Sequence, residues 1–385
     1  MLYIFIFLTS FLAVTLSIPS IIAVAIKKRL VDAPLESRKV HKRIVPNLGG
    51  IAIFSGFLFT ACLFIDSHLF PVANQLISAG LILFVIGLKD DIIGVGPLKK
   101  LIAQFISASI IAIVADIRIY SMQGFLNMYE LNYPTSIFLS VFFIVGVVNA
   151  FNLIDGIDGL AGSLGFIVAV LFAYLFNRTS EIGWSYLAIA LAGSLVGFLV
   201  HNVTPARIFM GDSGSLVIGF LAAVFGIKFL DSSSIHTVML GDDIQIKSAP
   251  ALVLSILIVP LFDTVRVFTL RILNNKSPFQ ADRNHIHHRL LKIGFGHTKA
   301  TLTLVSITLL FIAISFALQN IGNTQLIALL VLLATITNTL LSFYINQVYE
   351  SVVPSIDEEE SIEAPEIILP YKVAAKKVFQ KISEN

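Results

Sequence analysis

The sequence is a succession of apolar runs, most of them long enough to cross a membrane. The hydrocarbon core of a bilayer is about 30 Å thick, and a helix of about 20 residues spans it. A soluble domain has about 25% charged residues, whereas this chain has 13%. The sequence therefore predicts an all-α, polytopic membrane helix bundle with about 11 transmembrane helices. The candidate spans are Leu2–Ile26, Gly49–Ile65, Asn74–Leu88, Leu98–Ile117, Ile137–Leu153, Leu160–Phe176, Trp184–Val200, Ser215–Phe229, Ala249–Leu270, Thr301–Leu318 and Gln325–Tyr344.

Three of these runs have unusual features. Asn74–Leu88 and Ser215–Phe229 are short for a full crossing. Pro260 lies inside Ala249–Leu270, and a proline inside a helix removes a backbone hydrogen bond and kinks the helix. We therefore expect a bent helix in the segment that contains Pro260.

The distribution of basic residues predicts how the chain is threaded through the membrane. Cytoplasmic loops of membrane proteins carry an excess of Lys and Arg. Threading from an external N-terminus places all of the 26 Lys and Arg residues on one side, except Arg118, Arg178, Lys228 and Lys247. The sequence therefore predicts an N-terminus outside and a C-terminus in the cytoplasm.

The chain divides by composition into two predicted domains. Residues 1–346 form the transmembrane domain, which holds every candidate catalytic residue discussed below. Residues 347–385 form a charged cytoplasmic tail, with an acidic run at Asp357–Glu360 and a short amphipathic stretch at Tyr371–Ile382. Basic amphipathic helices bind anionic lipid surfaces, so we expect this stretch to lie on the inner leaflet; docking of a partner is the alternative.

The most polar stretch between two apolar runs is Val148–Gly162. It contains the amides Asn149 and Asn152 and the carboxylates Asp155 and Asp158. Such groups are not left in hydrocarbon, so the stretch is expected at an interface or in a cavity lined by protein. The alternative is an ordinary turn at the membrane edge, since Asp-Gly pairs are common turn formers.

Two adjacent acids, Asp90 and Asp91, end another apolar run, and Lys99 and Lys100 follow them. Adjacent carboxylates repel each other unless a cation or a proton lies between them. Oxygen ligands of this kind suit Mg²⁺, which binds through one or two carboxylates together with substrate phosphates. The alternative is a solvated pair that caps the next helix.

Two further stretches combine charge with turn residues. In Arg207–Ser215 an acid, Asp212, lies between glycines just before an apolar run, where it could be a helix cap or part of an anion site. Ser277–Arg289 contains three histidines and two arginines. Because arginine favours bidentate phosphate contacts, we interpret it as a phosphate or nucleotide loop. A zinc site is less favoured, since the stretch has no cysteine and no HExxH pattern.

A basic stretch, Val31–Gly50, precedes the second apolar run and contains Lys39 and His41. Basic residues at a membrane surface commonly set topology or contact lipid headgroups. The functional alternative is a clamp for anionic phosphates.

The predicted threading places all five polar stretches on the cytoplasmic side. Together they offer carboxylates suited to Mg²⁺, bases suited to phosphate, and an opening onto the inner leaflet. This combination favours phosphoryl transfer between a soluble phosphorylated donor and a membrane lipid. An ion-coupled secondary transporter is the competing class, because buried acids and histidines also mark ion pathways. A non-catalytic scaffold would leave the clustered acids and histidines unexplained.

The order of the five stretches, from about Val31 to Leu290, resembles that of the polyprenyl-phosphate N-acetylhexosamine-1-phosphate transferases. These WecA/TagO-type enzymes of glycosyltransferase family 4 are related to MraY. The resemblance implies transfer of a sugar 1-phosphate from a UDP-amino sugar to undecaprenyl phosphate, with release of UMP. It also implies Mg²⁺ as cofactor, with Mn²⁺ as an alternative metal, and an early membrane step in the synthesis of cell-wall glycans, O-antigen or teichoic acid.

The resemblance also implies roles for individual residues. Asp90, Asp91 and the histidines His285, His287 and His288 match catalytic motifs, and Asp212 matches a Mg²⁺ ligand, with Asp91 and Asp155 as further candidate ligands. Phe209 is similar to an aromatic residue that stacks on uracil. The remaining candidates for substrate binding are Lys39, His41, Lys100, Asn149, Asn152, Asp155, Asp158, Arg283 and Arg289.

Two differences from the MraY branch indicate which branch of the family this chain resembles. The MraY branch, whose donor carries a peptide, has a lysine shortly after the paired acids, where this chain has Gly94. It also has three consecutive histidines, where this chain has His285-Ile286-His287-His288. Both favour the WecA/TagO side, with UDP-N-acetylglucosamine as donor; an MraY-type transferase is the alternative.

The resemblance further implies a multi-pass protein of the bacterial cytoplasmic membrane whose active site faces the cytoplasm. The expected partners are the two substrates and the lipid bilayer. No nucleic acid partner is expected, and a homodimer is one candidate assembly state.

Overall fold

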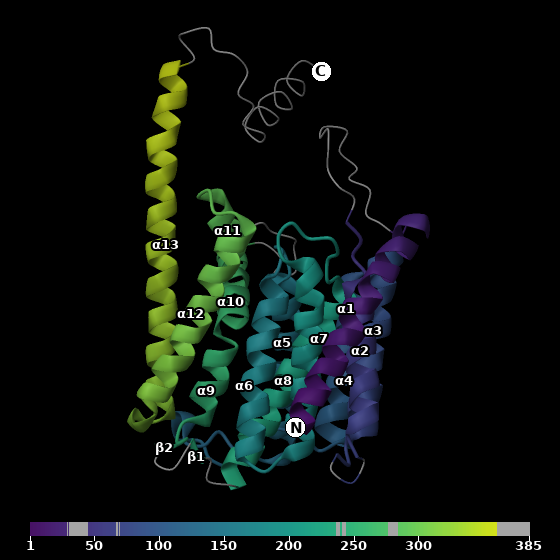
Figure 1. The fold of residues 1–385 in the computed structure, drawn as a ribbon. Coiled ribbons are helices and arrows are strands. Elements are labelled where there is room, and N and C mark those ends of the chain that lie inside the picture. The colour runs from purple at the N-terminus through teal and green to yellow at the C-terminus, as the bar shows by residue number, and fades with distance from the viewer. Residues whose placement is uncertain are drawn as a thin grey trace. The chain divides into compact units, whose positions relative to one another are not determined.

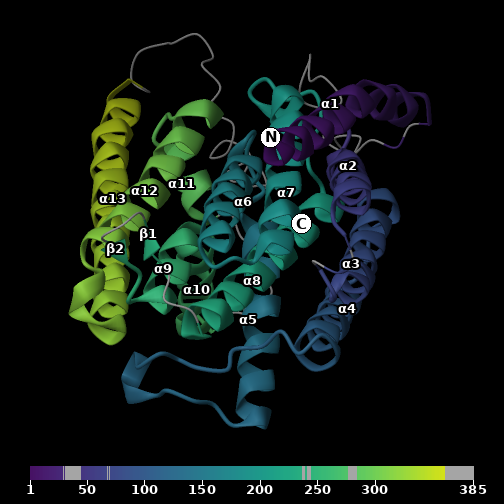
Figure 2. The ribbon, with the colours of Figure 1, turned by 60° about the horizontal axis from the view of Figure 1, so that its bottom comes forward.

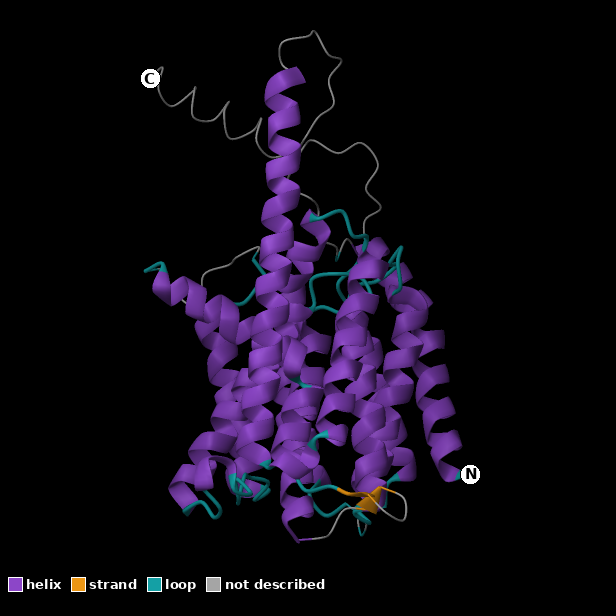
Figure 3. Cartoon of the chain, turned by 90° about the vertical axis from the view of Figure 1, so that its left-hand side faces the viewer, coloured by secondary structure: helices purple, strands orange, loops and turns teal. Residues whose placement is uncertain are grey.

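The computed structural model describes residues 1–28, 30, 45–66, 68, 70–235, 239–240, 244–275 and 284–359. The described chain is helical apart from one pair of two-residue strands (Figure 3). This confirms the predicted all-α, polytopic membrane fold. Residues from Thr337 onward form a separate compact unit, and the features below belong to the unit Met1–Ile336.

Each of the eleven predicted spans contains a helix. In chain order the elements are α1 (Leu2–Lys28), α2 (Gly49–Phe64), α3 (Ala73–Ile93), α4 (Pro97–Ser109), η1 (Ile110–Val114), η2 (Phe125–Asn127), α5 (Tyr133–Ile154), α6 (Leu160–Arg178), α7 (Ile182–Asn202), α8 (Asp212–Ile235), β1 (Met239–Leu240), β2 (Ile244–Gln245), α9 (Ala249–Ile256), α10 (Ile258–Leu273), α11 (Ile286–Lys292), α12 (His297–Ala317), η3 (Gln319–Ile321) and α13 (Asn323–Glu359).

Not every one of these helices is long and apolar enough to cross a membrane by itself. Among the described residues, eight helices pass that test, or nine if α9 and α10 form one bent span. α2 has only 16 residues, and α3 carries Lys89, Asp90 and Asp91 near its end; neither belongs to that set. The number of crossings and the orientation of the chain stay predictions.

The expected bend near Pro260 is present. α9 and α10 meet at an angle of 76°, and the break falls at Leu257, three residues before the proline. Because proline has no N–H, the carbonyl four residues earlier, that of Ile256, cannot receive its helical hydrogen bond. The helix therefore ends at Ile256 and restarts in a new direction.

Helix α8 is the most enclosed of the candidate spans. In it, 94% of the most apolar 18-residue stretch is buried, whereas the figure for α1 is 22%. α8 packs against α2, α3, α5, α6 and α9. Lys228 is the one charged residue that every such stretch of α8 contains, and a helix that is apolar on nearly all sides is typically surrounded by other helices. The N-terminus of α8 is thereby placed among the ends of α2, α3 and α5.

Aromatic side chains fill the space between α6, α7 and α8. Trp184 packs edge-on against Phe225, with ring centroids 6.3 Å apart, and lies 5.9 Å from Phe176. It also contacts Phe70, from the connection between α2 and α3, at 4.7 Å in an edge-to-face pair. Such geometry is favoured over face-to-face stacking because ring edges are positive and ring faces negative.

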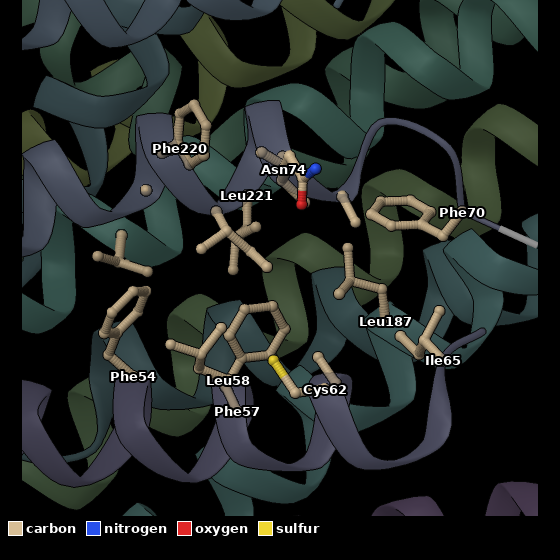
Figure 4. A pocket seen from close by; sticks show the side chains of 16 residues that line it. Phe54, Phe57, Leu58, Cys62, Ile65, Phe70, Asn74, Leu187, Phe220 and Leu221 are labelled. Carbon is tan, nitrogen blue, oxygen red and sulfur yellow. The ribbon is translucent and has the colours of Figure 1, made fainter. Parts of the chain in front are cut away.

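Next to these aromatic residues lies a cavity of about 220 Å³. Its walls come from α2, α3, α7 and α8 and from Phe70 (Figure 4). The lining is almost entirely apolar, with Asn74 as an exception, and Cys62 lies on its α2 side. None of the polar residues described in the next section lines it.

The two ends of the bundle are marked by different elements of the described chain. The first residues of α1 and the β1–β2 pair lie at one end, and α11 lies at the other (Figure 1). The connection from η1 to α5 extends from the β1–β2 end (Figure 2). Three hydrogen bonds tie this connection to the start of α13: Leu126 N–H donates to Thr324 Oγ1, the Thr324 hydroxyl donates to the Gly124 carbonyl, and Asn323 Nδ2 donates to the Gln123 carbonyl.

The second unit runs from Thr337 to Asn385. Within it α13 continues to Glu359, so the predicted domain boundary at residue 346 falls inside a helix. The predicted amphipathic stretch Tyr371–Ile382 lies outside the described residues. The division into a membrane domain and a cytoplasmic tail stays a prediction.

Candidate active site

Polar side chains from α3, α4 and α8 meet at the N-terminus of α8. The ammonium group of Lys100 lies 2.7 Å from Asp90 Oδ2 and 2.5 Å from Asp212 Oδ2. All three side chains are about one-fifth exposed. One cation from α4 therefore bridges two carboxylates that are 122 residues apart in sequence. The predicted substrate-binding residue Lys100 thus lies between a predicted catalytic acid and the predicted metal ligand.

The second acid of the pair, Asp91, binds the backbone of α8. Its Oδ1 accepts a hydrogen bond from the Asp212 N–H at 2.7 Å. Its Oδ2 accepts from the Ser213 N–H at 3.0 Å and from the Ser213 hydroxyl at 2.6 Å. The first N–H groups of a helix have no partner within it and carry partial positive charge. Asp91 therefore acts as a cap supplied by a neighbouring helix.

Two glycines allow this close approach. Gly87, one turn before Asp91, lies against the Asp212–Ser213 peptide, and a Cβ at Gly87 would come within 2.6 Å of the Ser213 nitrogen. Gly211, just before α8, has φ +71°, a left-handed conformation that costs glycine little. The backbone of α3 can thus touch the start of α8, which brings Asp91 within reach of its amides.

Asp155 ends α5 close to the same carboxylates. Burial, together with the negative charges of Asp212 and Asp91, raises the pKa of Asp155 to about 7. A raised carboxyl pKa shows that a second or third anion is unfavourable there without a nearby cation. The end of α5 therefore contributes to an acidic cluster formed by Asp90, Asp91, Asp155 and Asp212.

The two asparagines before Asp155 connect α5 to its neighbours. Asn152 Nδ2 donates to the Ser215 hydroxyl of α8 at 3.0 Å. Asn149 Nδ2 donates to Gln104 Oε1 of α4 at 2.7 Å. Both predicted substrate-binding residues thus already bind other helices, and they link α5 to α4 and to α8.

Asp158 lies in a different set of contacts. Its Oδ1 is 3.1 Å from His297 Nδ1 of α12, and its Oδ2 accepts from the Ala206 N–H at 3.2 Å. Its carbonyl accepts from the Thr301 hydroxyl at 3.0 Å. Asp158 therefore ties the α7–α8 loop to α12.

The histidine motif lies beside the α5–α6 turn. The ring of His287 packs directly against Gly156, where any Cβ would collide with it. His287 is 1% exposed, and neither ring nitrogen has a hydrogen-bond partner among the residues that the structure describes. Burial, together with the neighbouring His288, lowers the pKa of His287 to about 3. His287 is therefore neutral at physiological pH and touches the chain next to Asp155.

His285 and His288 flank this ring. The rings of His285 and His287 are stacked with centroids 5.9 Å apart, and those of His287 and His288 are 4.2 Å apart. His285 is buried and binds Asp263 of α10, with Nδ1 2.9 Å from Oδ2. The three predicted histidines thus form one group next to the acidic cluster.

Two further predicted site residues, Phe209 and Arg289, belong to the α7–α8 loop and to α11. Phe209 is 40% exposed in the α7–α8 loop, where its N–H donates to the Pro46 carbonyl at 2.8 Å. Arg289 is 7% exposed on α11, and burial and the charge of Arg266 lower its pKa. The predicted residues Lys39, His41 and Arg283 lie outside the described residues.

Several polar residues at this end were not among the predicted site residues. Asp263 and Arg266 lie on α10, and His297 lies on α12. The sequence does contain a signal for Asp263, because this acid lies inside the apolar run Ala249–Leu270. Charged residues inside such runs mark function or pairing. That Asp263 pairs with His285 could not be read from the sequence.

The donors of the acidic cluster fit a magnesium ion. Among the residues that the structure describes, no three His, Cys, Asp or Glu side chains form a complete metal cage. Mg²⁺ does not require one, because it keeps waters and binds substrate phosphates through one or two carboxylates. Asp155 and Asp212 have carboxylates suited to this, whereas the Asp91 oxygens already accept three hydrogen bonds.

Comparisons with known proteins find relatives that match most of this chain. The profile of glycosyl transferase family 4 matches residues 74–230. A probable undecaprenyl-phosphate N-acetylglucosaminyl 1-phosphate transferase of Bacillus subtilis is 30% identical over 322 residues, 82% of this chain and 84% of that protein. A decaprenyl-phosphate N-acetylglucosaminephosphotransferase of Mycobacterium leprae is 33% identical over 285 residues, 69% of this chain and 71% of that protein.

A third relative comes from another bacterial group. The undecaprenyl-phosphate alpha-N-acetylglucosaminyl 1-phosphate transferase of Salmonella typhi is 30% identical over 285 residues, 72% of this chain and 73% of that protein. The matched segment 74–230 includes Asp90, Lys100, Asp155 and Asp212. Identity at this level over most of both chains, together with the profile match, shows that this protein belongs to glycosyl transferase family 4.

Proposed function

We propose that this protein transfers N-acetylglucosamine 1-phosphate from UDP-N-acetylglucosamine to undecaprenyl phosphate, forming undecaprenyl-diphospho-N-acetylglucosamine and releasing UMP. The observation that carries the proposal is the acidic cluster around Lys100, which lies at one end of a helical membrane bundle. The phosphate group of a polyprenyl phosphate is held near the membrane surface by its lipid chain, so it can reach this end of the bundle. Phosphoryl transfer there needs positioned charge more than covalent help from the protein.

The lipid acceptor and the UDP-sugar donor are supported by different observations. The names of the relatives give undecaprenyl or decaprenyl phosphate as acceptor and N-acetylglucosamine 1-phosphate as the group transferred. The UDP portion of the donor is our inference from the polar residues around the cluster. Phe209 is 40% exposed, which suits stacking on a base, and we assign the group of His285, His287 and His288 to the donor diphosphate.

We further propose that Mg²⁺ is required and that Asp212 and Asp155 hold it. When bound there, the ion would neutralise the donor diphosphate as a Lewis acid. Lys100 supplies a positive charge at the same place, and Asp91 fixes the N-terminus of α8, which positions the Asp212 carboxylate.

The reaction is a single displacement in this proposal. An oxygen of the lipid phosphate attacks the phosphorus next to the sugar, and the bond from that phosphorus to the oxygen of UMP breaks. A phosphate monoester has a second pKa of about 6 and is largely dianionic at neutral pH. The nucleophile therefore needs no strong base, and Asp90 has a positioning role through its ion pair with Lys100.

The proposed setting is the cytoplasmic face of the bacterial inner membrane, where UDP-sugars are made. The positive-inside distribution of Lys and Arg supports this orientation. The end of the bundle with α11 and the acidic cluster would then face the cytoplasm (Figure 1). The product would begin the assembly of an envelope glycan on its lipid carrier.

The test uses purified full-length protein in detergent with undecaprenyl phosphate and radiolabelled UDP-N-acetylglucosamine, with and without Mg²⁺. We expect lipid-linked label and release of UMP, both only with Mg²⁺. Release of UDP would mean transfer of the sugar without its phosphate and would refute the mechanism. If label moves only from a peptide-bearing UDP-muramoyl donor, the protein is instead an MraY-type transferase.

Two matched variants test the assignment of Asp212. Asp212→Asn should lose Mg²⁺-dependent turnover, because an amide is a poor ligand for this ion. Asp231→Asn makes the same change on the same helix, near its other end, where Asp231 pairs with Lys228, and should keep wild-type turnover. Near-normal turnover of folded Asp212→Asn would remove Asp212 from the metal site.

A further inference from the structure

The carboxylate of Asp263 is the centre of a buried polar group that links α10 to α11. Asp263 is 2% exposed. Its Oδ1 accepts hydrogen bonds from Arg266 at 2.8 Å and from the Ile286 N–H at 3.0 Å. Its Oδ2 lies 2.9 Å from Nδ1 of His285, which is 4% exposed. Both oxygens are therefore used, and one side chain contacts the first two residues of the histidine motif.

These partners establish which ring nitrogen of His285 carries a proton. Arg266 and a backbone N–H can only donate, so the Asp263 carboxyl is the acceptor on that side. The Arg266 cation next to it also favours its ionised form. An ionised carboxylate accepts only, and the atom that faces it at 2.9 Å must then carry hydrogen. His285 is therefore protonated on Nδ1, and Nε2 is left as the nitrogen through which the ring can act.

The same contacts determine where α11 begins. The Ile286 N–H is the first amide of α11, and Asp263 supplies the acceptor that the helix lacks. Arg266 also donates to the Asn284 carbonyl, just before the helix. α10 thus holds the chain on both sides of His285, and the ring of His285 stacks on His287, which touches Gly156.

We propose that Asp263 is a positioning residue of the transferase: it fixes the Nδ1–H form of His285 and sets α11 against the α5–α6 turn. The role of His285 toward the donor diphosphate rests on the proposed function; the contact of Asp263 with His285 does not. A carboxylate that orients a functional histidine in this way is a recurring arrangement.

The first measurement needs no activity. Full-length protein labelled with ¹⁵N at histidine is examined by NMR in detergent, with His285→Gln used to assign the His285 signals. We expect Nδ1 of His285 to be protonated in the wild type, and Asp263→Asn to move the ring toward the Nε2–H form. A wild-type ring protonated on Nε2 alone would overturn the proposal, and so would an unchanged ring in Asp263→Asn.

The second measurement is kinetic. Asp263→Asn should lower kcat roughly 10- to 100-fold, as loss of the partner of a functional histidine does, and should change the KM for the UDP-sugar much less. Combined with His285→Ala, it should cost little beyond His285→Ala alone, because both changes remove the same function. If the two losses multiply, Asp263 does not act through His285.

A matched control and a folding check complete the design. Asp231→Asn removes another acid paired with a basic side chain, at the opposite end of α8, and should leave kcat and the His285 signals as in wild type. If Asp263→Asn does not fold, the wild-type protonation pattern still decides the proposal. If wild-type protein transfers no label from any UDP-amino sugar, the proposed function fails while the NMR result stands.

Discussion

At the scale of single residues, the four acids of the cluster differ in what they already bind. Asp90 and Asp212 share the ammonium group of Lys100. Asp91 accepts three hydrogen bonds from the start of α8, and Asp155 is held near other negative charges. Adjacent residues of one sequence motif thus have separate tasks: Asp90 faces a cation, whereas Asp91 anchors a helix.

The role of Asp91 as an anchor predicts an order of stability. Asp91→Ala removes all three hydrogen bonds and leaves the first amides of α8 without a partner, which should cost roughly 1 to 3 kcal/mol of the free energy of unfolding. Asp91→Asn keeps an acceptor oxygen and should cost less. Thermal unfolding of both variants in detergent measures this order. An Asp91→Ala variant as stable as wild type would show that the cap contributes nothing.

His287 predicts how stability depends on pH. Its pKa is about 3 in the folded protein because burial disfavours the charged ring, whereas an exposed histidine has a pKa of about 6.5. Between these values the unfolded chain binds the proton and the folded chain does not. The contribution of His287 to stability is therefore fully present above about pH 6.5 and is lost as pH falls toward 3.

The measurement compares melting midpoints of wild type and His287→Gln at about pH 7.5 and pH 5. Wild type should lose more stability on acidification than the variant, because glutamine does not titrate in this range. Equal losses in the two proteins would show that His287 is already charged or exposed in the folded state.

At the scale of elements, the site depends on how closely α3 approaches the N-terminus of α8. Gly87 touches the backbone of Asp212 and Ser213, whereas Gly80, two turns earlier, has its nearest neighbours at 3.7 Å and 3.8 Å. The first contact is with peptide atoms that cannot move alone. The second is ordinary van der Waals contact with the rings of Phe220 and Phe54.

These two glycines form a matched pair of substitutions on one helix. Gly87→Ala should push α3 away from α8, move Asp91 out of reach of its amides, and reduce both stability and transferase activity. Gly80→Ala should be tolerated, and the better helix propensity of alanine, worth about 1 kcal/mol, could offset any crowding. Activity and melting midpoint are measured for both. Similar behaviour of the two variants would contradict the packing described for Gly87.

The elements themselves could be predicted from sequence, whereas their contacts could not. Every predicted apolar run contains a helix because burial of the backbone in lipid leaves few other structures, and Pro260 marked the bend between α9 and α10. The pairing of Lys100 with both Asp90 and Asp212 joins residues far apart in sequence. Asp263 was missed because its partner His285 belongs to another helix.

At the scale of the whole molecule, the two ends of the bundle differ in chemistry. The acidic cluster and α11 belong to one end, and the η1–α5 connection and the β1–β2 pair belong to the other (Figures 1 and 2). The sequence predicted that the polar motifs would share a side, because basic residues are distributed unequally across membranes. Which side faces the cytoplasm follows from that rule and not from the packing.

Cysteine labelling tests this orientation. Cys62 is the only cysteine in the chain, so Cys62→Ala gives a background into which single cysteines are placed at the exposed positions Met128 and Lys292. A maleimide that does not cross membranes should label Met128→Cys in intact cells. Lys292→Cys should react only after the cells are made permeable, and the reverse pattern would invert the predicted topology.

The aromatic packing around Trp184 has a consequence for optical experiments. Trp184 is the only tryptophan in the chain, and it is enclosed by phenylalanines from α6, α8 and the α2–α3 connection. The tryptophan fluorescence of the protein therefore comes from one residue and reports the interior of the bundle. A spectral change when substrate binds would mean that events at the carboxylates reach the packing of α7 and α8.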